Sequence, residues 1–287
     1  MLSHHNLIKS LPIWDTTVDV KELQGGITNS NYLVNHNSKM YVVRIVEEQP
    51  CLGIDRRNEV LCMKAGYECG ISPDVVYTGS GIMVTNFIEG KVLEPANLSE
   101  NLYLPLVTEV LKIVHDSDHK LSKEVLSFSP FEVVKTYYQR VIDLKVKMPN
   151  GLNRAIGEVE LLENQVGSFI PTLCHNDVLA ANWIFDGSKM WLIDWEYAGI
   201  GNRMFDLGNL AHNAGFTENM DKALLKSYFG KYNDKVLREF KIMKAVSGLR
   251  ECLWSLIQTK ISDLNFDFHK YAADNLQAYN TFLKQLK

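Results

Sequence analysis

One short segment limits most strongly what this chain of 287 residues can be: HNDVLAAN, which begins at His175. In it, Asp177 stands two residues after the histidine, and Asn182 stands five residues after the aspartate. A second carboxylate, Asp194, follows the apolar run WLI. This spacing is typical of the H-x-D-x-x-x-x-N catalytic loop of kinases and of the aspartate that binds their metal. A polar hairpin with a capped turn explains the first segment equally well, but it does not explain the two segments together.

These side chains have the chemistry that phosphoryl transfer requires. A hydroxyl acceptor loses its proton as it attacks the γ-phosphate of ATP, and the carboxylate of Asp177 is the candidate base. Magnesium, which neutralises the phosphate oxygens, prefers hard oxygen ligands, and Asn182 and Asp194 supply them. The sequence therefore predicts a phosphotransferase that uses ATP and Mg²⁺, with Asp177 as its catalytic residue.

The candidates for nucleotide binding lie in the first third of the chain. The loop LQGGITNSN lets the backbone approach phosphate oxygens, although such a loop is also a common hairpin turn. Arg44 stands where a kinase has its phosphate-binding lysine, and Glu59 is either its orienting partner or a solvated charge on a helix. The residues expected to bind the nucleotide are Gly25, Gly26, Thr28, Asn29, Arg44, Glu59 and Asn86.

Residue patterns divide the chain into a strand-rich part and a helical part. Residues 20 to 88 contain β-branched and aromatic segments, a polar NHNSK turn and one helix from Arg56 to Glu68. After Gly90, apolar residues recur at helical spacing in 102–115, 130–148 and 235–260, interrupted by a β-rich segment at 173–193. We therefore predict an α+β protein with two lobes. The small β-rich lobe, residues 1–88, binds the nucleotide, and the larger helical lobe, residues 89–287, carries the catalytic loop and the acceptor pocket.

Composition excludes several other classes of protein. The net charge is −4 and the basic residues are scattered, so neither a nucleic acid nor an anionic membrane is expected as a partner. The five cysteines lack the paired spacing of a zinc site and the density of a disulfide scaffold, which favours reduced thiols. No segment has the roughly 18 apolar residues that cross a bilayer, and we expect a cytoplasmic protein.

Seven segments follow one another in an order and rough spacing that match one known family: LQGGITN, YVVRI, the Glu59 helix ending at GISP, CHNDVLAAN, LIDWEYAG, FDLGNLA and LWSLIQTKISDLNFDFHKYA. From about residue 20 to 280, the chain resembles the choline/ethanolamine kinases, within the wider aminoglycoside phosphotransferase-like group. The resemblance implies a protein-kinase-like fold, with Asp177 as the base and Asn182 and Asp194 as Mg²⁺ ligands. It also implies that Asp206 braces the catalytic loop, although capping of a helix is an equally simple role.

The resemblance further implies a small cationic amino alcohol as the acceptor, bound next to Asp177. Aromatic residues that match the family's choline pocket are Tyr197, Trp254, Phe266 and Tyr271. Ring faces of this kind hold a quaternary ammonium through cation–π contacts. Aromatic residues on helices also commonly belong to the core, so this assignment is a hypothesis.

The sequence departs from the animal choline kinases at two positions of this pocket. Glu251 stands where they carry a second tryptophan, and Leu179 stands where they tend to have glutamine. We expect Glu251 to contact an acceptor that has N–H donors, such as ethanolamine, or to pair with Arg250 or a neighbouring helix. The pattern leaves both roles open.

Other functions on the same scaffold remain as alternatives. The acceptor is choline or ethanolamine, or else thiamine or an aminoglycoside. A catalytically silent, nucleotide-binding regulatory protein is a third possibility, although Asp177, Asn182 and Asp194 are all present. No activation loop of the protein-kinase type follows Asp194. The sequence does not predict an oligomeric state.

Overall fold

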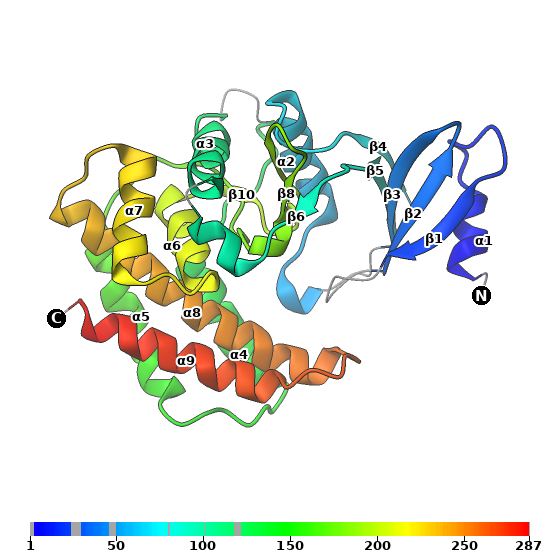
Figure 1. Cartoon of the computed structure of the whole chain (residues 1–287). Coiled ribbons are helices and arrows are strands. Elements are labelled where there is room, and N and C mark those ends of the chain that lie inside the picture. Colours follow the sequence, from blue (N-terminus) through cyan, green and yellow to red (C-terminus); the bar gives the residue numbers. More distant parts are fainter. Residues whose placement is uncertain are drawn as a thin grey trace.

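A five-stranded antiparallel sheet forms the N-terminal lobe of the chain, with the strands in the order β1-β2-β3-β5-β4. The computed structural model describes residues 3–23, 30–45, 50–79, 81–100, 102–117 and 122–286. The elements of this lobe are α1 (His4–Lys9), β1 (Asp19–Leu23), β2 (Ser30–His36), β3 (Lys39–Ile45), η1 (Pro50–Leu52), α2 (Arg56–Glu68), β4 (Val75–Gly79) and β5 (Ile82–Asn86). Figure 1 shows α1 on the outer side of the sheet and α2 on the side of the helical lobe.

The predicted hairpin at the NHNSK turn is confirmed. Strands β2 and β3 pair from Ser30 with Ile45 to His36 with Lys39. The turn residues Asn37 and Ser38 have positive φ angles of 50° and 63°, as the tight turns that match strand twist require. The outer face of the sheet buries Val34, Val43 and Val84 against Ile8 of α1, which gives the lobe a small apolar core of its own.

Helix α2 spans the residues that the sequence predicts, Arg56 to Glu68. The side chain of Asp55 caps its first turn by accepting the backbone N–H of Asn58 at 2.8 Å. The helix lies so close to Trp195 that a Cβ on Gly66 would stand 2.7 Å from the indole ring. Only glycine permits this approach. Glu59, on the same helix, is fully buried.

The C-terminal lobe is mostly helical, with two small sheets close to the N-terminal lobe. The small sheets have the strand orders β6-β8-β9 and β10-β7. The elements of this lobe are β6 (Lys91–Val92), η2 (Pro95–Ser99), α3 (Tyr103–His115), α4 (Pro130–Asp143), α5 (Leu152–Val166), β7 (Thr172–Cys174), η4 (Ala180–Asn182), β8 (Trp183–Phe185), β9 (Met190–Leu192), β10 (Gly199–Gly201), α6 (Arg203–Asn213), α7 (Glu218–Phe229), α8 (Asp234–Ile261) and α9 (Phe268–Lys284).

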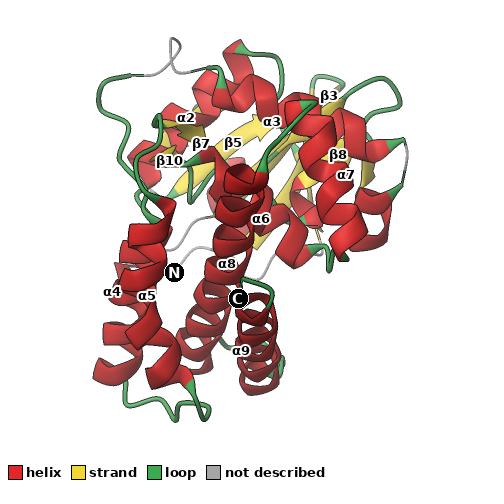
Figure 2. Cartoon of the chain, turned by 90° about the vertical axis from the view of Figure 1, so that its left-hand side faces the viewer, coloured by secondary structure: helices red, strands yellow, loops and turns green. Residues whose placement is uncertain are grey.

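The long helix α8 is the centre of the helical lobe. Figure 2 shows α4, α5, α8 and α9 as one group of helices, below α3, α6 and α7. Helix α8 packs against α4, α6 and α9. It meets α6 so closely that a Cβ on Gly208 would lie 2.6 Å from the backbone nitrogen of Lys244. The backbones of these two helices are therefore in direct contact.

One predicted helix is shorter than the sequence indicates. The expected helix over 130–148 ends at Asp143, because Leu144 caps it and Lys145 adopts a positive φ of 51°. The five cysteines are free thiols, as predicted. No helix in the described ranges is both long and apolar enough to cross a membrane.

Candidate active site

The catalytic loop lies between β7 and η4 and holds Asp177 at 9% exposure. Asn176 adopts a positive φ of 63°, a conformation that costs a non-glycine residue roughly 1–3 kcal/mol. Its side chain donates to the carbonyl oxygen of Tyr197 at 3.0 Å, which ties the loop to the segment after Asp194. The amide nitrogen of Asn182 donates to the carbonyl oxygen of Asp177 at 2.8 Å. These bonds fix the direction of the Asp177 carboxylate.

The carboxylate of Asp206, on α6, binds the backbone of this loop. Its carboxylate accepts the backbone N–H groups of His175 at 2.8 Å and Asn176 at 2.7 Å. His115 lies 3.1 Å from the same carboxylate and 2.7 Å from the hydroxyl of Tyr228. Asp206 therefore braces the loop, and the cap of α6 is a different residue, Asn202. His115 is part of this buried support.

The electrostatics around Asp177 suit a general base. Burial raises the pKa of its carboxyl to about 7, although the positive charge of Arg250 lowers it and the charge of Glu251 raises it further. The guanidinium of Arg250 lies 3.4 Å from Asp177 Oδ1 and donates to the carbonyl oxygen of Asn176 at 3.0 Å. A base whose pKa lies near neutral pH can accept a proton and later release it.

The segment that carries Asp194 lies beside Asn182. The backbone N–H of Ile193 donates to the carbonyl oxygen of Asn182 at 3.0 Å, which places the two segments side by side. The amide nitrogen of Asn182 faces the Asp177 segment, and Arg44 engages Oδ1 of Asp194 at 2.6 Å. These contacts do not involve Oδ1 of Asn182 or Oδ2 of Asp194, and oxygens of this kind are the hard donors that fit Mg²⁺.

A chain of alternating charges links this carboxylate to α2. Arg44 contacts Glu59 as well as Asp194, which confirms the predicted pairing of the arginine with the helical glutamate. Glu59 also accepts from Arg56 at 2.9 Å, and Arg56 donates to Glu196 at 3.0 Å. Burial and the charge of Asp194 raise the pKa of Glu196, and Arg44 and Arg56 counteract them.

The other five residues expected to bind the nucleotide have no described side-chain contact that bears on this role. Asn86 is exposed at the end of β5, opposite Tyr41 of β3, and its backbone N–H donates to the carbonyl oxygen of Asp74 at 3.1 Å. Four further candidates lie outside the described residues: Gly25, Gly26, Thr28 and Asn29.

On the acceptor side, Tyr197 and Glu251 both contact Arg250. The guanidinium of Arg250 stacks on the ring of Tyr197 at 4.5 Å from the centroid and lies 3.3 Å from Glu251 Oε1. The hydroxyl of Tyr271 contacts Glu251 Oε2 at 3.4 Å. Burial raises the pKa of Glu251, while Arg250 and the Tyr271 hydroxyl lower it.

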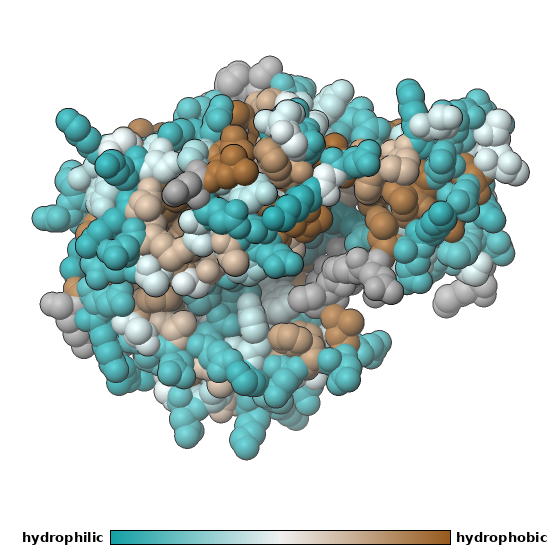
Figure 3. Space-filling view, viewed as in Figure 1, coloured by the Kyte–Doolittle hydropathy of each residue, from teal (hydrophilic) through white to brown (hydrophobic). Residues whose placement is uncertain are grey.

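The remaining two aromatic candidates lie at the edge of this group. Trp254 is partly buried one turn along α8, with its ring 6.1 Å from that of Phe268. Phe266 is 50% exposed and lies 5.7 Å from the ring of Tyr271. Figure 3 shows apolar side chains exposed near this corner between α8 and α9, below the hollow that separates the sheet lobe from the helices.

Two charged residues of this region, Arg56 and Glu196, were not predicted from the sequence, and Arg250 was expected only as a possible partner of Glu251, a pairing that the structure contains. A signal existed for Arg250, because an arginine and a glutamate stand side by side in the otherwise apolar stretch of α8. Arg56 precedes Glu59 by three residues, which places both on one helix face. Glu196 gave no signal, because its partner Arg56 is 140 residues away along the chain.

The two-lobed fold and this set of side chains define a kinase-like phosphotransferase that acts on an alcohol group. The family model for choline/ethanolamine kinases matches residues 20–226. The chain belongs to the choline/ethanolamine kinase family. Membership of this kinase family implies the use of ATP.

Known relatives cover nearly the whole chain. Protein LicA of Haemophilus influenzae is 24% identical over 274 residues, covering 91% of this chain and 79% of LicA. Human ethanolamine kinase 2 is 26% identical over 305 residues, covering 95% of this chain and 78% of the relative. A solved choline/ethanolamine kinase family protein from Mesorhizobium loti superposes with a TM-score of 0.80 at 24% identity, covering 98% and 93% of the two chains.

Solved structures from the wider group that the sequence indicates are similar to this chain in fold. Solved phosphotransferases for spectinomycin, a macrolide and an aminoglycoside share the fold, with TM-scores between 0.61 and 0.69. At sequence identities of 14 to 15%, these similarities show a shared fold and not a shared function.

Proposed function

We propose that this protein transfers the γ-phosphate of ATP to the hydroxyl of a small amino alcohol, choline or ethanolamine. The observation that carries the proposal is the buried Asp177 carboxylate, braced through its loop by Asp206 and flanked by Asn182 and Asp194. Family membership supports the same reaction. A silent regulatory protein would not need the proposed base and the two proposed metal ligands together.

The proton of the acceptor hydroxyl passes to Asp177. As the acceptor oxygen forms its bond to the γ-phosphorus, the bond between that phosphorus and the bridging oxygen of ADP breaks. Asn182 and the catalytic-loop backbone hold the carboxylate in the direction of the hydroxyl. Orientation and electrostatics carry most of the catalysis of such transfers.

Asn182 and Asp194 are the proposed ligands of Mg²⁺, which supplies charge neutralisation at the phosphate oxygens. Arg44 is the proposed phosphate clamp, and Glu59 fixes the direction of its guanidinium. The loop with Gly25, Gly26, Thr28 and Asn29, together with Asn86, completes the proposed nucleotide side. We place the division between the nucleotide lobe and the acceptor lobe near residue 88.

The acceptor side comprises the surroundings of Asp177 on α8 and α9. We propose that Tyr197, Glu251, Trp254, Phe266 and Tyr271 bind the cationic head group. The support for this set is spatial: the Tyr271 hydroxyl contacts Glu251, and the ring of Phe266 lies 5.7 Å from that of Tyr271. No nucleic acid or membrane partner is proposed, and the location that fits this reaction is the cytoplasm.

Release of ADP from Mg·ATP in a coupled assay tests the proposal. Choline, ethanolamine, thiamine and kanamycin serve as separate acceptors, with a reaction lacking acceptor as the blank. We expect turnover above the blank with choline or ethanolamine, and mass spectrometry of the product should find the phosphate ester. Turnover with thiamine or kanamycin alone would retain the mechanism and overturn the proposed acceptor. Silence with all four would contradict the proposal.

A further inference from the structure

Two neighbouring residues of α8 bring opposite charges into the acceptor site. Arg250 is 1% exposed and Glu251 is 6% exposed, and both lie next to Asp177. One nitrogen of the Arg250 guanidinium reaches the Asn176 carbonyl at 3.0 Å, Glu251 at 3.3 Å and Asp177 at 3.4 Å. The guanidinium is therefore shared between the base and the glutamate.

The charges of this cluster do not balance. Asp177 and Glu251 carry two negative charges when ionised, and Arg250 carries one positive charge. The nearby Asp194 and Glu196 share a separate pair of arginines, Arg44 and Arg56, with the buried Glu59. Burying an unpaired charge is costly, so a single positive charge on the acceptor would complete the cluster. The pKa of Glu251, which burial raises in spite of Arg250, agrees with this incomplete compensation.

Contacts within the protein already occupy part of the aromatic surface that could bind a quaternary ammonium. A quaternary ammonium has no N–H group and depends on ring faces. One face of Tyr197 is covered by the guanidinium of Arg250, at 4.5 Å from the centroid. Phe266 is half exposed at the corner before α9, and the ring of Trp254 packs edge-on to Phe268. A cage of rings around a trimethylammonium group is therefore incomplete among the described residues.

Glu251 has hydrogen-bonding capacity that a quaternary ammonium cannot use. A carboxylate offers about four lone-pair positions. Among the described residues, Glu251 Oε1 is approached by Arg250 and Oε2 by the hydroxyl of Tyr271, both at the long distances of 3.3 and 3.4 Å. An ammonium with N–H donors can form short, charge-assisted bonds to such a carboxylate.

We infer that Glu251, held in place by Arg250 and Tyr271, binds the acceptor ammonium through its N–H groups and makes the enzyme prefer ethanolamine to choline. The inference rests on the proposed function and names the acceptor of that same site. Tyr271 orients the carboxylate, and Glu251 touches the acceptor itself.

A series of four acceptors tests it: ethanolamine, N-methylethanolamine, N,N-dimethylethanolamine and choline. The series removes the N–H donors one at a time and keeps the positive charge. For the wild-type protein we expect kcat/KM to fall along the series, by at least about tenfold in total. Equal or higher kcat/KM for choline would overturn the inference and leave the proposed function intact. Absence of turnover with all four would overturn both.

Two variants test whether Glu251 and Tyr271 cause the preference for ethanolamine over choline. Glu251→Gln should lower kcat/KM for ethanolamine by at least about tenfold and for choline by less than about threefold. Tyr271→Phe keeps the carboxylate and should shift the same ratio in the same direction by a smaller factor. Glu109→Gln, at an exposed position of α3, is the matched control and should leave the ratio unchanged. A ratio that stays at the wild-type value in folded Glu251→Gln would overturn the inference, and Tyr271→Phe and the wild-type series test it independently of that variant's folding.

Discussion

Arg44 Nη1 donates to Asp194 Oδ1 at 2.6 Å, so the proposed phosphate-binding residue contacts the proposed metal ligand directly. The two side chains come from different lobes, from β3 and from the segment after β9. Phosphate oxygens would compete with Asp194 for the guanidinium, and a metal would compete with Arg44 for the carboxylate. The contact thus joins the lobes at the place where the nucleotide is proposed to bind.

Replacement of Arg44 should weaken nucleotide binding selectively. We expect Arg44→Gln to raise the KM for ATP by at least about tenfold, because a charge-assisted bond to phosphate is lost, and to leave the KM for the acceptor within about twofold. Steady-state kinetics with each substrate varied in turn measures both values. Arg57→Gln is the control, because Arg57 has a side chain 77% exposed that pairs with Glu124. Equal changes in both KM values for Arg44→Gln would contradict its role.

Removal of the proposed base should affect turnover and spare the nucleotide. Asp177→Asn should lower kcat by at least about a hundredfold, since a positioned base contributes this much or more. Isothermal titration should still detect ATP binding at close to the wild-type affinity. Turnover near the wild-type value would show that another group accepts the proton.

The brace of the catalytic loop is open to a similar test. Asp206→Asn loses one of the two oxygens that accept the N–H groups of His175 and Asn176. We expect a kcat at least about tenfold lower with both KM values nearly unchanged, because the base is misdirected while the binding surfaces persist. Breaking a buried network should also lower Tm by several degrees, by about 2–4 °C per kcal/mol. A lower Tm with normal kcat would restrict Asp206 to a role in stability.

The kinetics of a Trp254 variant can show whether this side chain contacts the acceptor or only packs in the core. Trp254→Ala should raise the KM for the acceptor far more than the KM for ATP, because the indole is proposed to face the ammonium. Trp191→Ala, on β9, where Lys189 stacks on the indole ring, provides the comparison and should leave the acceptor KM unchanged. If Trp254→Ala changes the two KM values equally, the side chain belongs to the core.

Much of the site could be predicted because its signals are local in sequence. The candidates Asp177, Asn182 and Asp194 come from one loop and one neighbouring strand, and helix α2 was expected from the residue pattern over Arg56 to Glu68. The stacking of Arg250 on Tyr197 could not be predicted, because their contact depends on how α8 crosses the catalytic loop. The helix α1 was also missed: its six residues are too few for a clear period.

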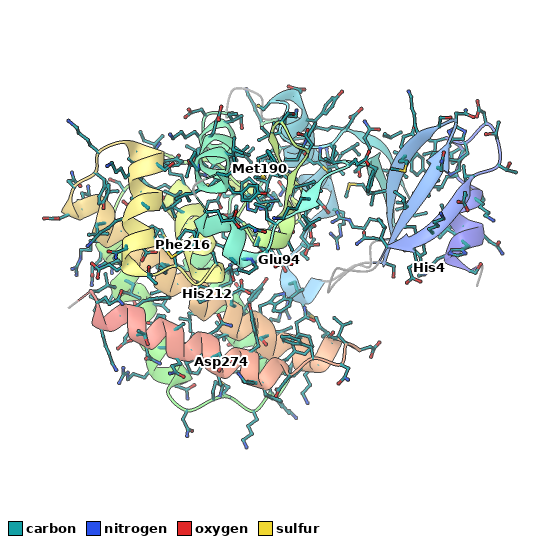
Figure 4. The ribbon with its side chains drawn as sticks, viewed as in Figure 1. His4, Glu94, Met190, His212, Phe216 and Asp274 are labelled. Atoms are coloured by element: carbon teal, nitrogen blue, oxygen red, sulfur yellow. The ribbon has the colours of Figure 1, made fainter. Side chains whose placement is uncertain are left out.

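Stability should depend on pH through His212. Figure 4 shows this residue of α6 above the C-terminal helix α9, where its ring nitrogen lies 2.6 Å from Asn275 Oδ1. Burial lowers its pKa to about 4 in the folded protein, against about 6.5 in an unfolded chain. Between these values only the unfolded state binds the proton, so the free energy of unfolding falls as the pH falls from about 6.5 toward 4.

The variant His212→Gln keeps a donor for Asn275 and cannot be protonated in this range. Its unfolding free energy, measured with urea, should fall less steeply with pH between 6.5 and 4, by up to about 1.4 kcal/mol per pH unit. His269→Gln is the control, because His269 is exposed to solvent on α9, and it should leave the slope unchanged. An unchanged slope in His212→Gln would assign the acid sensitivity to other groups.

The close crossing of α6 and α8 at Gly208 has a consequence for how such enzymes diversify. Helix α6 carries Asp206, which directs the base, and α8 carries Glu251, which is proposed to read the head group. Because the two backbones are in contact, the helices are held in a fixed relative position. The positioning of the base and the binding of the head group nevertheless depend on different side chains. Substitutions on one face of α8 can therefore change which acceptor binds. The catalytic loop, which Asp206 of α6 holds, would keep its geometry and its reaction.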